Sequence, residues 1–124
     1  MAMGSSILIV EDDRTNREAM ARLACHAGFD VDTASTLAEA WAKLPANGCI
    51  LLDIVLPDGR GLDLLRHIRE EKLPIHVAIV SGSLAAGDLE PYDSLRPDAV
   101  FVKPVKPDDV LHWLGSHCPA KAQR

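Results

Sequence analysis

Five strand-like segments alternate with helical patterns along this chain, and this alternation restricts the possible folds more than any other feature. Four of the segments are continuous apolar runs, namely Ser6–Val10, Cys49–Leu52, Ile75–Val80 and Ala99–Val102. The remaining segment, Phe29–Ala34, alternates as a half-exposed edge strand does. Unbroken apolar strands that alternate with helices indicate a parallel sheet covered on both faces. We therefore expect one α/β domain with a doubly wound five-stranded parallel sheet.

Five helices are expected to connect and cover these strands. Apolar spacing predicts helices over Arg14–Ala27, from Thr36 to Pro45, from Leu62 to Lys72, and from Pro107 onward. Gly28 should end the first helix, and Thr36 with Glu39 forms a capping box for the second. The segment 84–95 contains Gly87 and Pro91, so we expect a short, irregular helix there. Trp41 is predicted to be a core or groove residue.

The composition is that of an ordinary soluble domain. Apolar residues make up 48% of the chain and charged residues 25%, and the net charge of −5 argues against a nucleic-acid surface. No apolar run is long enough to span a bilayer, and residues 1–5 have no signal-peptide pattern, so they are expected to be a flexible leader. Residues 119–124 are predicted to be a polar tail. Cys25, Cys49 and Cys118 are predicted to be buried free thiols, which suits a cytoplasmic protein.

Polar side chains stand where the predicted strands end. Glu11 and Asp12 follow the first strand, Asp53 the third, Ser81 the fourth and Lys103 the fifth. The ligand site of such a sheet lies at the carboxyl ends of its strands. We therefore expect three carboxylates, one hydroxyl and one ammonium group to meet at one edge of the sheet.

This combination of side chains favours phosphoryl chemistry. Clustered carboxylates either raise a pKa or hold a cation, and Mg²⁺ is the hard divalent ion that such oxygen ligands prefer. A carboxylate can accept a phosphoryl group as an aspartyl-phosphate, whose charge Mg²⁺ and a lysine would neutralise. The alternative is a solvated acidic patch at Glu11–Asp13 that favours the start of the following helix.

With these residues in place, the chain resembles the receiver domain of two-component response regulators. The resemblance rests on four motifs, Ile9–Asp13, Leu51–Gly59, Val80–Gly82 and Phe101–Pro104, and covers residues 6–118. It implies a flavodoxin-like sheet with strand order 2-1-3-4-5. It also implies that Asp53 accepts a phosphoryl group from a histidine kinase or a histidine phosphotransfer protein.

The same resemblance assigns roles to the other residues of the edge. Asp12 would bind Mg²⁺ directly and Glu11 through water, with Asp53 and the backbone carbonyl of Val55 as further ligands. Ser81 and Lys103 would contact the phosphoryl group and report its presence by moving the surface nearby. Asp13 lies outside this set. The family often dimerises through its last helices, so a homodimer is expected as one possible assembly.

One position departs from the family pattern. The aromatic residue that reports phosphorylation usually stands three residues before the lysine, and that position here is Val100. Phe101 is one residue later and should face the opposite side of the strand, toward the core.

Two other functions remain to be compared with a phospho-accepting receiver. A degenerate receiver would bind a partner without phosphorylation, and the altered position 100 keeps that alternative open. A phosphatase of the haloacid dehalogenase type would need a general acid two residues after the nucleophile, where this chain has Val55. We therefore expect a signalling domain rather than an enzyme, with no nucleic-acid or membrane partner.

Overall fold

The computed structural model describes residues 6–45, 48–82 and 94–118. Its central sheet contains five parallel strands in the order β2-β1-β3-β6-β7. The strands are β1 (Ser6–Val10), β2 (Asp30–Ala34), β3 (Gly48–Asp53), β6 (Ile75–Ser81) and β7 (Ala99–Val102). The sheet order 2-1-3-4-5 and the edge position of the alternating segment are confirmed.

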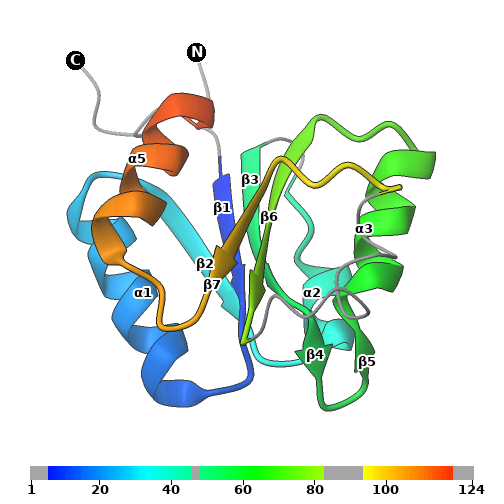
Figure 1. Ribbon diagram of the computed structural model, residues 1–124, viewed down its shortest axis with the longest axis horizontal. Helices are drawn as coiled ribbons and strands as arrows, with labels where there is room; N and C mark the ends of the chain where they lie inside the picture. The colour runs from blue at the N-terminus through cyan, green and yellow to red at the C-terminus, as the bar shows by residue number, and fades with distance from the viewer. Residues whose placement is uncertain (1–5, 46–47, 83–93, 119–124) are drawn as a thin grey trace.

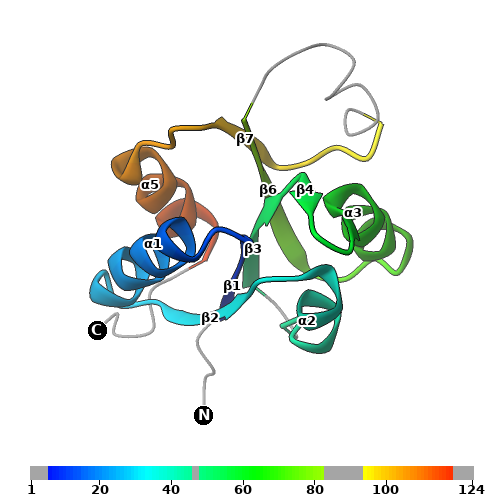
Figure 2. The same ribbon diagram turned by 90° about the horizontal axis from the view of Figure 1, so that it is seen from below.

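Helices cover both faces of this sheet, as Figures 1 and 2 show. On one side lie α1 (Arg14–His26) and α5 (Pro107–His117), and on the other lie α2 (Leu37–Ala42) and α3 (Gly61–Glu70). Each side has its own apolar core, one centred on Ile7, Leu51 and Trp113 and the other on Leu8, Leu52 and Leu65. Successive residues of one strand enter different cores because side chains alternate across a sheet.

Local sequence signals set the end of α1 and the start of α2 where they were predicted, whereas α2 ends at Ala42, before the predicted end at Pro45. Gly28 adopts φ +100°, and the N–H groups of Gly28 and Phe29 donate to the carbonyls of Cys25 and Ala24, which closes α1. Thr36 caps α2 by accepting from the N–H of Glu39, as expected. The Glu39 carboxylate accepts from the N–H of Ser35 rather than that of Thr36.

Two predictions of burial are wrong, those for Trp41 and Cys25. Trp41 is 40% exposed, and its ring lies against His67 of α3, with ring centroids 4.5 Å apart, rather than in the closed core. Cys25 is exposed, since it lies on the outer face of α1. Leu23 is 38% exposed because it borders a groove rather than the closed core. Cys49 and Cys118 are buried free thiols, as predicted.

A small hairpin follows β3 where a simple turn was expected. Its strands, β4 (Val55–Leu56) and β5 (Gly59–Arg60), pair antiparallel beside α2 and α3. The structure describes four helices, and most of the expected helix over residues 84–95 lies outside the described residues. None of the described helices is long and apolar enough to cross a membrane.

Candidate functional site

Three carboxylates meet at the carboxyl edge of the sheet, as the sequence predicted. Glu11 and Asp12 follow β1, Asp53 ends β3, and one oxygen from each lies within 4.8 Å of the others. Glu11 is 7% exposed and Asp53 is 6% exposed, whereas Asp12 is open to solvent. Burying two carboxylates this far is costly unless a cation compensates their charge.

Lys103 supplies such a cation from the end of β7. Its Nζ lies 3.0 Å from Glu11 Oε1 and 3.0 Å from Asp53 Oδ2. Burial lowers the pKa of Lys103, but its bonds to the two carboxylates outweigh that effect and the net shift is upward. Burial, together with the nearby Asp53, raises the pKa of Glu11. The backbone N–H of Asp13 and the ammonium group of Lys103 both lower this pKa, but the net shift is upward. The ammonium group therefore holds two acids that would otherwise repel each other.

Asp13 serves the helix rather than the acidic cluster. Its Oδ2 accepts from the N–H of Asn16 at 2.8 Å, which makes it the N-cap of α1. Its own N–H donates to Glu11 Oε2 at 3.1 Å. Both oxygens of Glu11 are thus engaged by the protein, one by Lys103 and the other by the backbone.

Ser81 and Val55 lie at the same edge, Ser81 at the end of β6 and Val55 just after β3. Ser81 ends β6, is 5% exposed, and accepts at its carbonyl from the N–H of Lys103 at 2.8 Å. Val55 is 69% exposed, and its N–H donates to Asp53 Oδ1 at 3.3 Å. The five residues Glu11, Asp12, Asp53, Ser81 and Lys103 therefore share one edge in the arrangement that the sequence predicted.

Two residues that sequence reasoning did not single out fix the segment after Asp53. Gly61 donates from its N–H to the carbonyl of Ile54 at 2.9 Å, and a Cβ on Gly61 would collide with the carbonyl oxygen of Asp53. Asp58 lies in the hairpin turn, where its two oxygens accept from the N–H groups of Leu37 and Ala38 at 2.7 and 3.0 Å. Only the tertiary fold brings these partners together, since Asp58 and α2 are about twenty residues apart.

Arg17 is a third residue that the sequence analysis missed. Its Nη1 donates to the carbonyl oxygens of Glu11 at 2.9 Å and Asp12 at 3.3 Å. The guanidinium therefore contacts the backbone of two members of the acidic cluster. No motif in the sequence distinguished Arg17 from the other arginines of the same helix.

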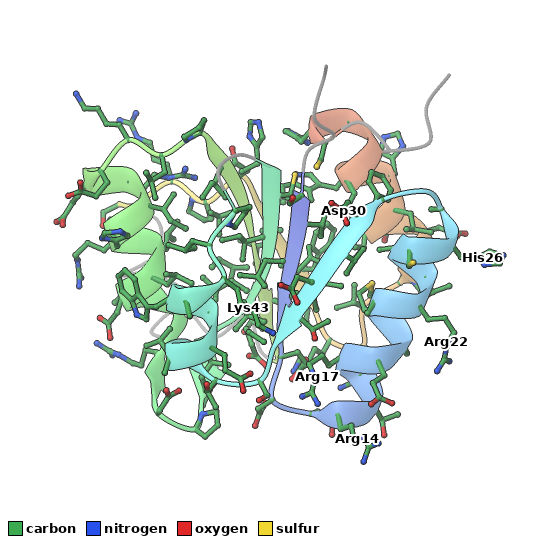
Figure 3. The ribbon with its side chains drawn as sticks, turned by 180° about the vertical axis from the view of Figure 1, so that it is seen from behind. Arg14, Arg17, Arg22, His26, Asp30 and Lys43 are labelled. Carbon is green, nitrogen blue, oxygen red and sulfur yellow. The ribbon has the colours of Figure 1, made fainter. Side chains whose placement is uncertain are left out.

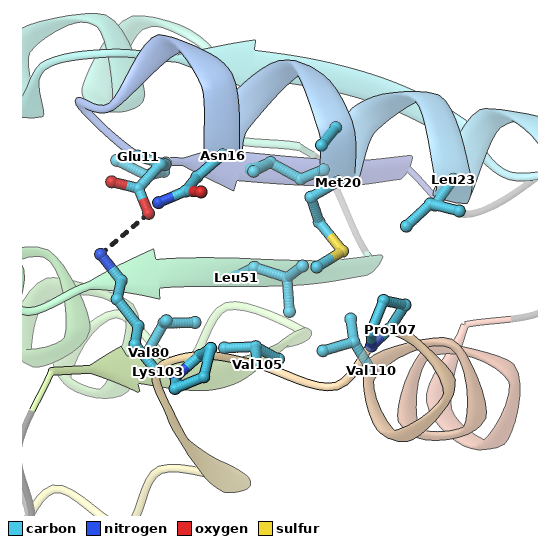
Figure 4. A pocket seen from close by; sticks show the side chains of 14 residues that line it. Glu11, Asn16, Met20, Leu23, Leu51, Val80, Lys103, Val105, Pro107 and Val110 are labelled. Carbon is cyan, nitrogen blue, oxygen red and sulfur yellow. Dashed lines mark ion pairs between the residues drawn. The ribbon is translucent and has the colours of Figure 1, made fainter.

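A groove of about 460 Å³ adjoins the cluster on the α1 side. Glu11 and Lys103 form its polar end, and apolar side chains such as Met20, Leu51 and Val110 line the rest (Figure 4). The dashed line in Figure 4 marks the ion pair between Glu11 and Lys103. The exposure of Leu23 follows from its position on this groove.

Comparison with known proteins agrees with this fold and this set of side chains. A family model described as the response regulator receiver domain matches residues 7–114. The chain therefore belongs to the response regulator receiver domain family, and it is a receiver module of two-component phosphorelay signalling. Members of this family are signalling domains that receive a phosphoryl group from kinases or phosphotransfer proteins.

Two curated relatives are similar over most of this chain. The DNA-binding transcriptional regulator NtrC of Rhizobium meliloti is 28% identical over 120 residues, which cover 90% of this chain and 23% of that protein. The photosynthetic apparatus regulatory protein RegA of Cereibacter sphaeroides is 28% identical over 113 residues, covering 88% of this chain and 60% of RegA. The chain thus spans less than two thirds of the length of either relative.

Solved structures show the same architecture. A CheY-like response regulator receiver domain protein from Methanospirillum hungatei superimposes with a TM-score of 0.83 at 28% identity, over 92% of this chain and 93% of that one. A response regulator receiver protein from Pseudomonas putida gives 0.80 at 24% identity, over 94% and 99% of the two chains. At 24% identity, the similarity to the Pseudomonas putida protein shows a shared fold alone.

The donor atoms of the cluster also fit the cation that this family binds. Glu11, Asp12 and Asp53 offer carboxylate oxygens, the hard ligands that Mg²⁺ prefers. Asp12 is exposed, which leaves room for the water molecules that Mg²⁺ retains. The acidic cluster therefore suits a hydrated magnesium ion better than a softer metal that would need histidine or cysteine ligands.

Proposed function

We propose that Asp53 is the phospho-acceptor of this receiver. Its carboxylate lies at the end of the central strand, at the carboxyl edge of the sheet, and both of its oxygens are held by the protein. Oδ2 accepts from Lys103 and Oδ1 from the N–H of Val55. A carboxylate held in a fixed position is the nucleophile that such a transfer requires.

The transfer would move one phosphoryl group between two side chains. An Asp53 oxygen attacks phosphorus in line with the leaving imidazole of a phosphohistidine on a histidine kinase or phosphotransfer protein. The P–N bond breaks, a P–O bond to Asp53 forms, and the donor histidine keeps the electron pair of the broken bond. Lys103 and the hydroxyl of Ser81 would donate to the phosphoryl oxygens, replacing contacts of the resting state.

Mg²⁺ would be held by Asp12 and Asp53 directly, by Glu11 through water, and by the backbone carbonyl of Val55. When bound, the ion supplies positive charge for the phosphoryl oxygens and the carboxylates. Asp12 is the member of the cluster without a bond to Lys103 among the described contacts, so its oxygens are the most available to a metal. Glu11 is less available because the protein already engages both of its oxygens.

The observation that carries the proposal is the position of Lys103. Its Nζ is 3.0 Å from both Glu11 and Asp53, so one ammonium group spans the metal-binding and acceptor carboxylates. A phosphoryl group on Asp53 would add negative charge beside this cation and draw it away from Glu11. Phosphorylation of this residue can therefore change contacts at the sheet edge without a change of fold.

Intact-protein mass after incubation with Mg²⁺ and acetyl phosphate tests the proposal, with Asp53→Asn as the matched variant. One added phosphoryl group is expected on the wild type and none on the variant. Uptake by Asp53→Asn would place the acceptor elsewhere. No uptake from acetyl phosphate or from a panel of histidine kinases, with the fold intact, would favour the degenerate receiver that binds partners without phosphorylation.

The proposal extends to the organisation of the chain. Residues 6–118 would form the receiver domain, with 1–5 as a leader and 119–124 as a polar tail. The strand that begins at Ser6, the helix that ends at His117 and the family match over 7–114 support these limits. A cytoplasmic location and a homodimer through the last helices, which include α5, are further proposals that rest on the family alone.

A further inference from the structure

Arg17 contacts the acidic cluster through the backbone rather than through carboxylates. The Nη1 atom lies 2.9 Å from the carbonyl oxygen of Glu11 and 3.3 Å from that of Asp12. These two residues form the loop that leaves β1, and their side chains are the proposed metal-binding groups. In Figure 3, Arg17 lies beside this loop, whereas Arg22 and His26 point outward from the far part of the same helix.

The position of this cation is electrostatically unfavourable in two respects. Arg17 belongs to the first turn of α1, where the helix dipole favours negative charge. It also stands next to a site for a divalent cation, which it should repel. Its side chain is half-buried, so the charge is only partly screened by water. Its charge also helps to lower the pKa of Glu18 and of Glu39, so the electrostatic effects at this position have both signs, and none of them requires contacts with two backbone carbonyls.

The carbonyl contacts of Arg17 give it a structural role in the loop after β1. Asp12 is exposed, and no described side-chain contact fixes its carboxylate. Its direction depends on the backbone of the loop, and that backbone is fixed on one side by the N–H of Glu11, which donates to the carbonyl of Ala34 at 3.0 Å. Arg17 fixes the carbonyl side of the same loop. A charged donor makes such hydrogen bonds stronger than a neutral one would.

We propose that Arg17 is a positioning residue for magnesium binding, which holds the Glu11–Asp12 backbone so that the Asp12 carboxylate faces the acceptor site. The inference rests on the proposed function, because it assumes that Mg²⁺ binds at this cluster. Residues that orient metal ligands commonly change metal affinity by about 10- to 100-fold when they are removed. The two physical effects of Arg17 have opposite signs, and this makes the proposal testable.

The test is a Mg²⁺ titration of the full chain followed by amide chemical shifts, on the wild type and on Arg17→Ala. Positioning predicts that Arg17→Ala binds Mg²⁺ about tenfold more weakly. Repulsion predicts the reverse, since removing a nearby cation should tighten binding. Arg14→Ala is the matched control, because Arg14 is a cation at the same end of α1 whose ion pair is with Glu18. Arg14→Ala should bind Mg²⁺ as tightly as the wild type or slightly more tightly.

Two further variants, Arg17→Lys and Asp12→Ala, distinguish a failure of the positioning role of Arg17 from a failure of the magnesium site itself. Arg17→Lys keeps a charged donor on a shorter side chain and should restore part of the lost Mg²⁺ affinity. If Arg17→Ala does not fold, Arg17→Lys is the variant that tests the proposal. Wild-type affinity in both Arg17→Ala and Arg17→Lys would overturn the proposal, as would equal weakening in Arg14→Ala. Asp12→Ala tests the metal site itself: if it binds Mg²⁺ as tightly as the wild type, the assignment of the metal site is wrong, irrespective of Arg17.

Discussion

The backbone carbonyl of Asp53 packs against the Cα of Gly61, so closely that a side chain at position 61 would collide with it. Gly61 opens α3 and is buried, and its N–H donates to the carbonyl of Ile54. The start of α3 thereby rests directly on the residue that carries the proposed acceptor. Any larger residue at 61 must move either the helix or Asp53.

Gly61→Ala should therefore disturb both stability and phosphorylation. Forcing a methyl group against the backbone is expected to cost about 1–3 kcal/mol of unfolding free energy. The acetyl phosphate reaction should slow as well, because Asp53 would shift relative to Lys103. Urea unfolding and the rate of mass increase measure the two effects. Gly115→Ala in α5 is the control, since a Cβ there meets no described atom within 4 Å, and helix propensity predicts equal or higher stability.

Asp58 ties the hairpin after Asp53 to the start of α2. Its carboxylate accepts from the N–H groups of Leu37 and Ala38, and these bonds lower the pKa of Asp58. In Asp58→Ala, both amides should exchange with solvent faster, which hydrogen exchange measures residue by residue. Thr36→Ala is the comparison, because it removes the cap on Glu39 instead and should leave Leu37 and Ala38 protected. Equal protection of these two amides in the wild type and in Asp58→Ala would contradict the role assigned to Asp58.

The lowered pKa of Asp98 predicts how the free energy of unfolding depends on pH. Its Oδ2 accepts from the N–H of Val77 at 2.7 Å and from Arg69 at 3.0 Å, and its side chain is 27% exposed. Burial raises the pKa of Asp98, but these two donors outweigh it, so the pKa falls below the usual 3.8. Because the folded-state pKa is the lower one, the carboxylate stabilises the fold above about pH 4 and loses this effect as the pH falls through the lowered pKa.

Asp98→Ala should therefore be less stable than the wild type by about 1–3 kcal/mol at pH 7. The difference should narrow as the pH is lowered below about 4, where the wild-type carboxyl also becomes protonated. Urea unfolding at pH 7, 5 and 3 provides the measurement. Asp30→Ala, which removes an exposed carboxylate at the start of β2, should change stability little at pH 7. A pH-independent difference for Asp98→Ala would show that packing, rather than charge, explains its effect.

Lys103→Ala should separate magnesium binding from the response to phosphorylation. Loss of the ammonium group leaves Glu11 and Asp53 without their shared cation, so Mg²⁺ should bind more tightly. The variant should also show smaller amide shift changes on phosphorylation, because the group that senses the added charge is gone. Amide shift changes equal to those of the wild type would mean that residues other than Lys103 couple phosphorylation of Asp53 to the surface.

Sequence reasoning predicted most of the site because strand ends can be read from apolar runs. Once the sheet is parallel, the residues that follow each strand must share one edge, which is how Asp53 and Lys103 could be placed together fifty residues apart. The same reasoning placed Phe101 and Val100 on opposite faces of β7. Phe101 is half-buried and packs edge-on to Trp113, with centroids 6.3 Å apart, whereas Val100 is 40% exposed.

Side-chain exposure on the helices was predicted less well. Apolar spacing identifies which face of a helix points inward, but it does not say how closely the next element covers that face. Leu23 lies on the inner side of α1 and still borders an open groove, because α1 and α5 do not close over it. Trp41 is also exposed, since its ring contacts His67 of α3 and the neighbouring helix covers only part of it.

By itself, the sequence determined the order of strands and helices, the receiver family, and the five side chains at the carboxyl edge. These features depend on periodicity and on motifs that are local in the chain. The tertiary structure alone decided that Arg17 holds the Glu11–Asp12 backbone, that Asp58 caps a helix about twenty residues away, and that Gly61 admits the carbonyl of Asp53. Each of these contacts joins a side chain or a Cα to the backbone of another segment. Backbone groups are the same at every residue, so no sequence pattern records which of them a given side chain or Cα will meet.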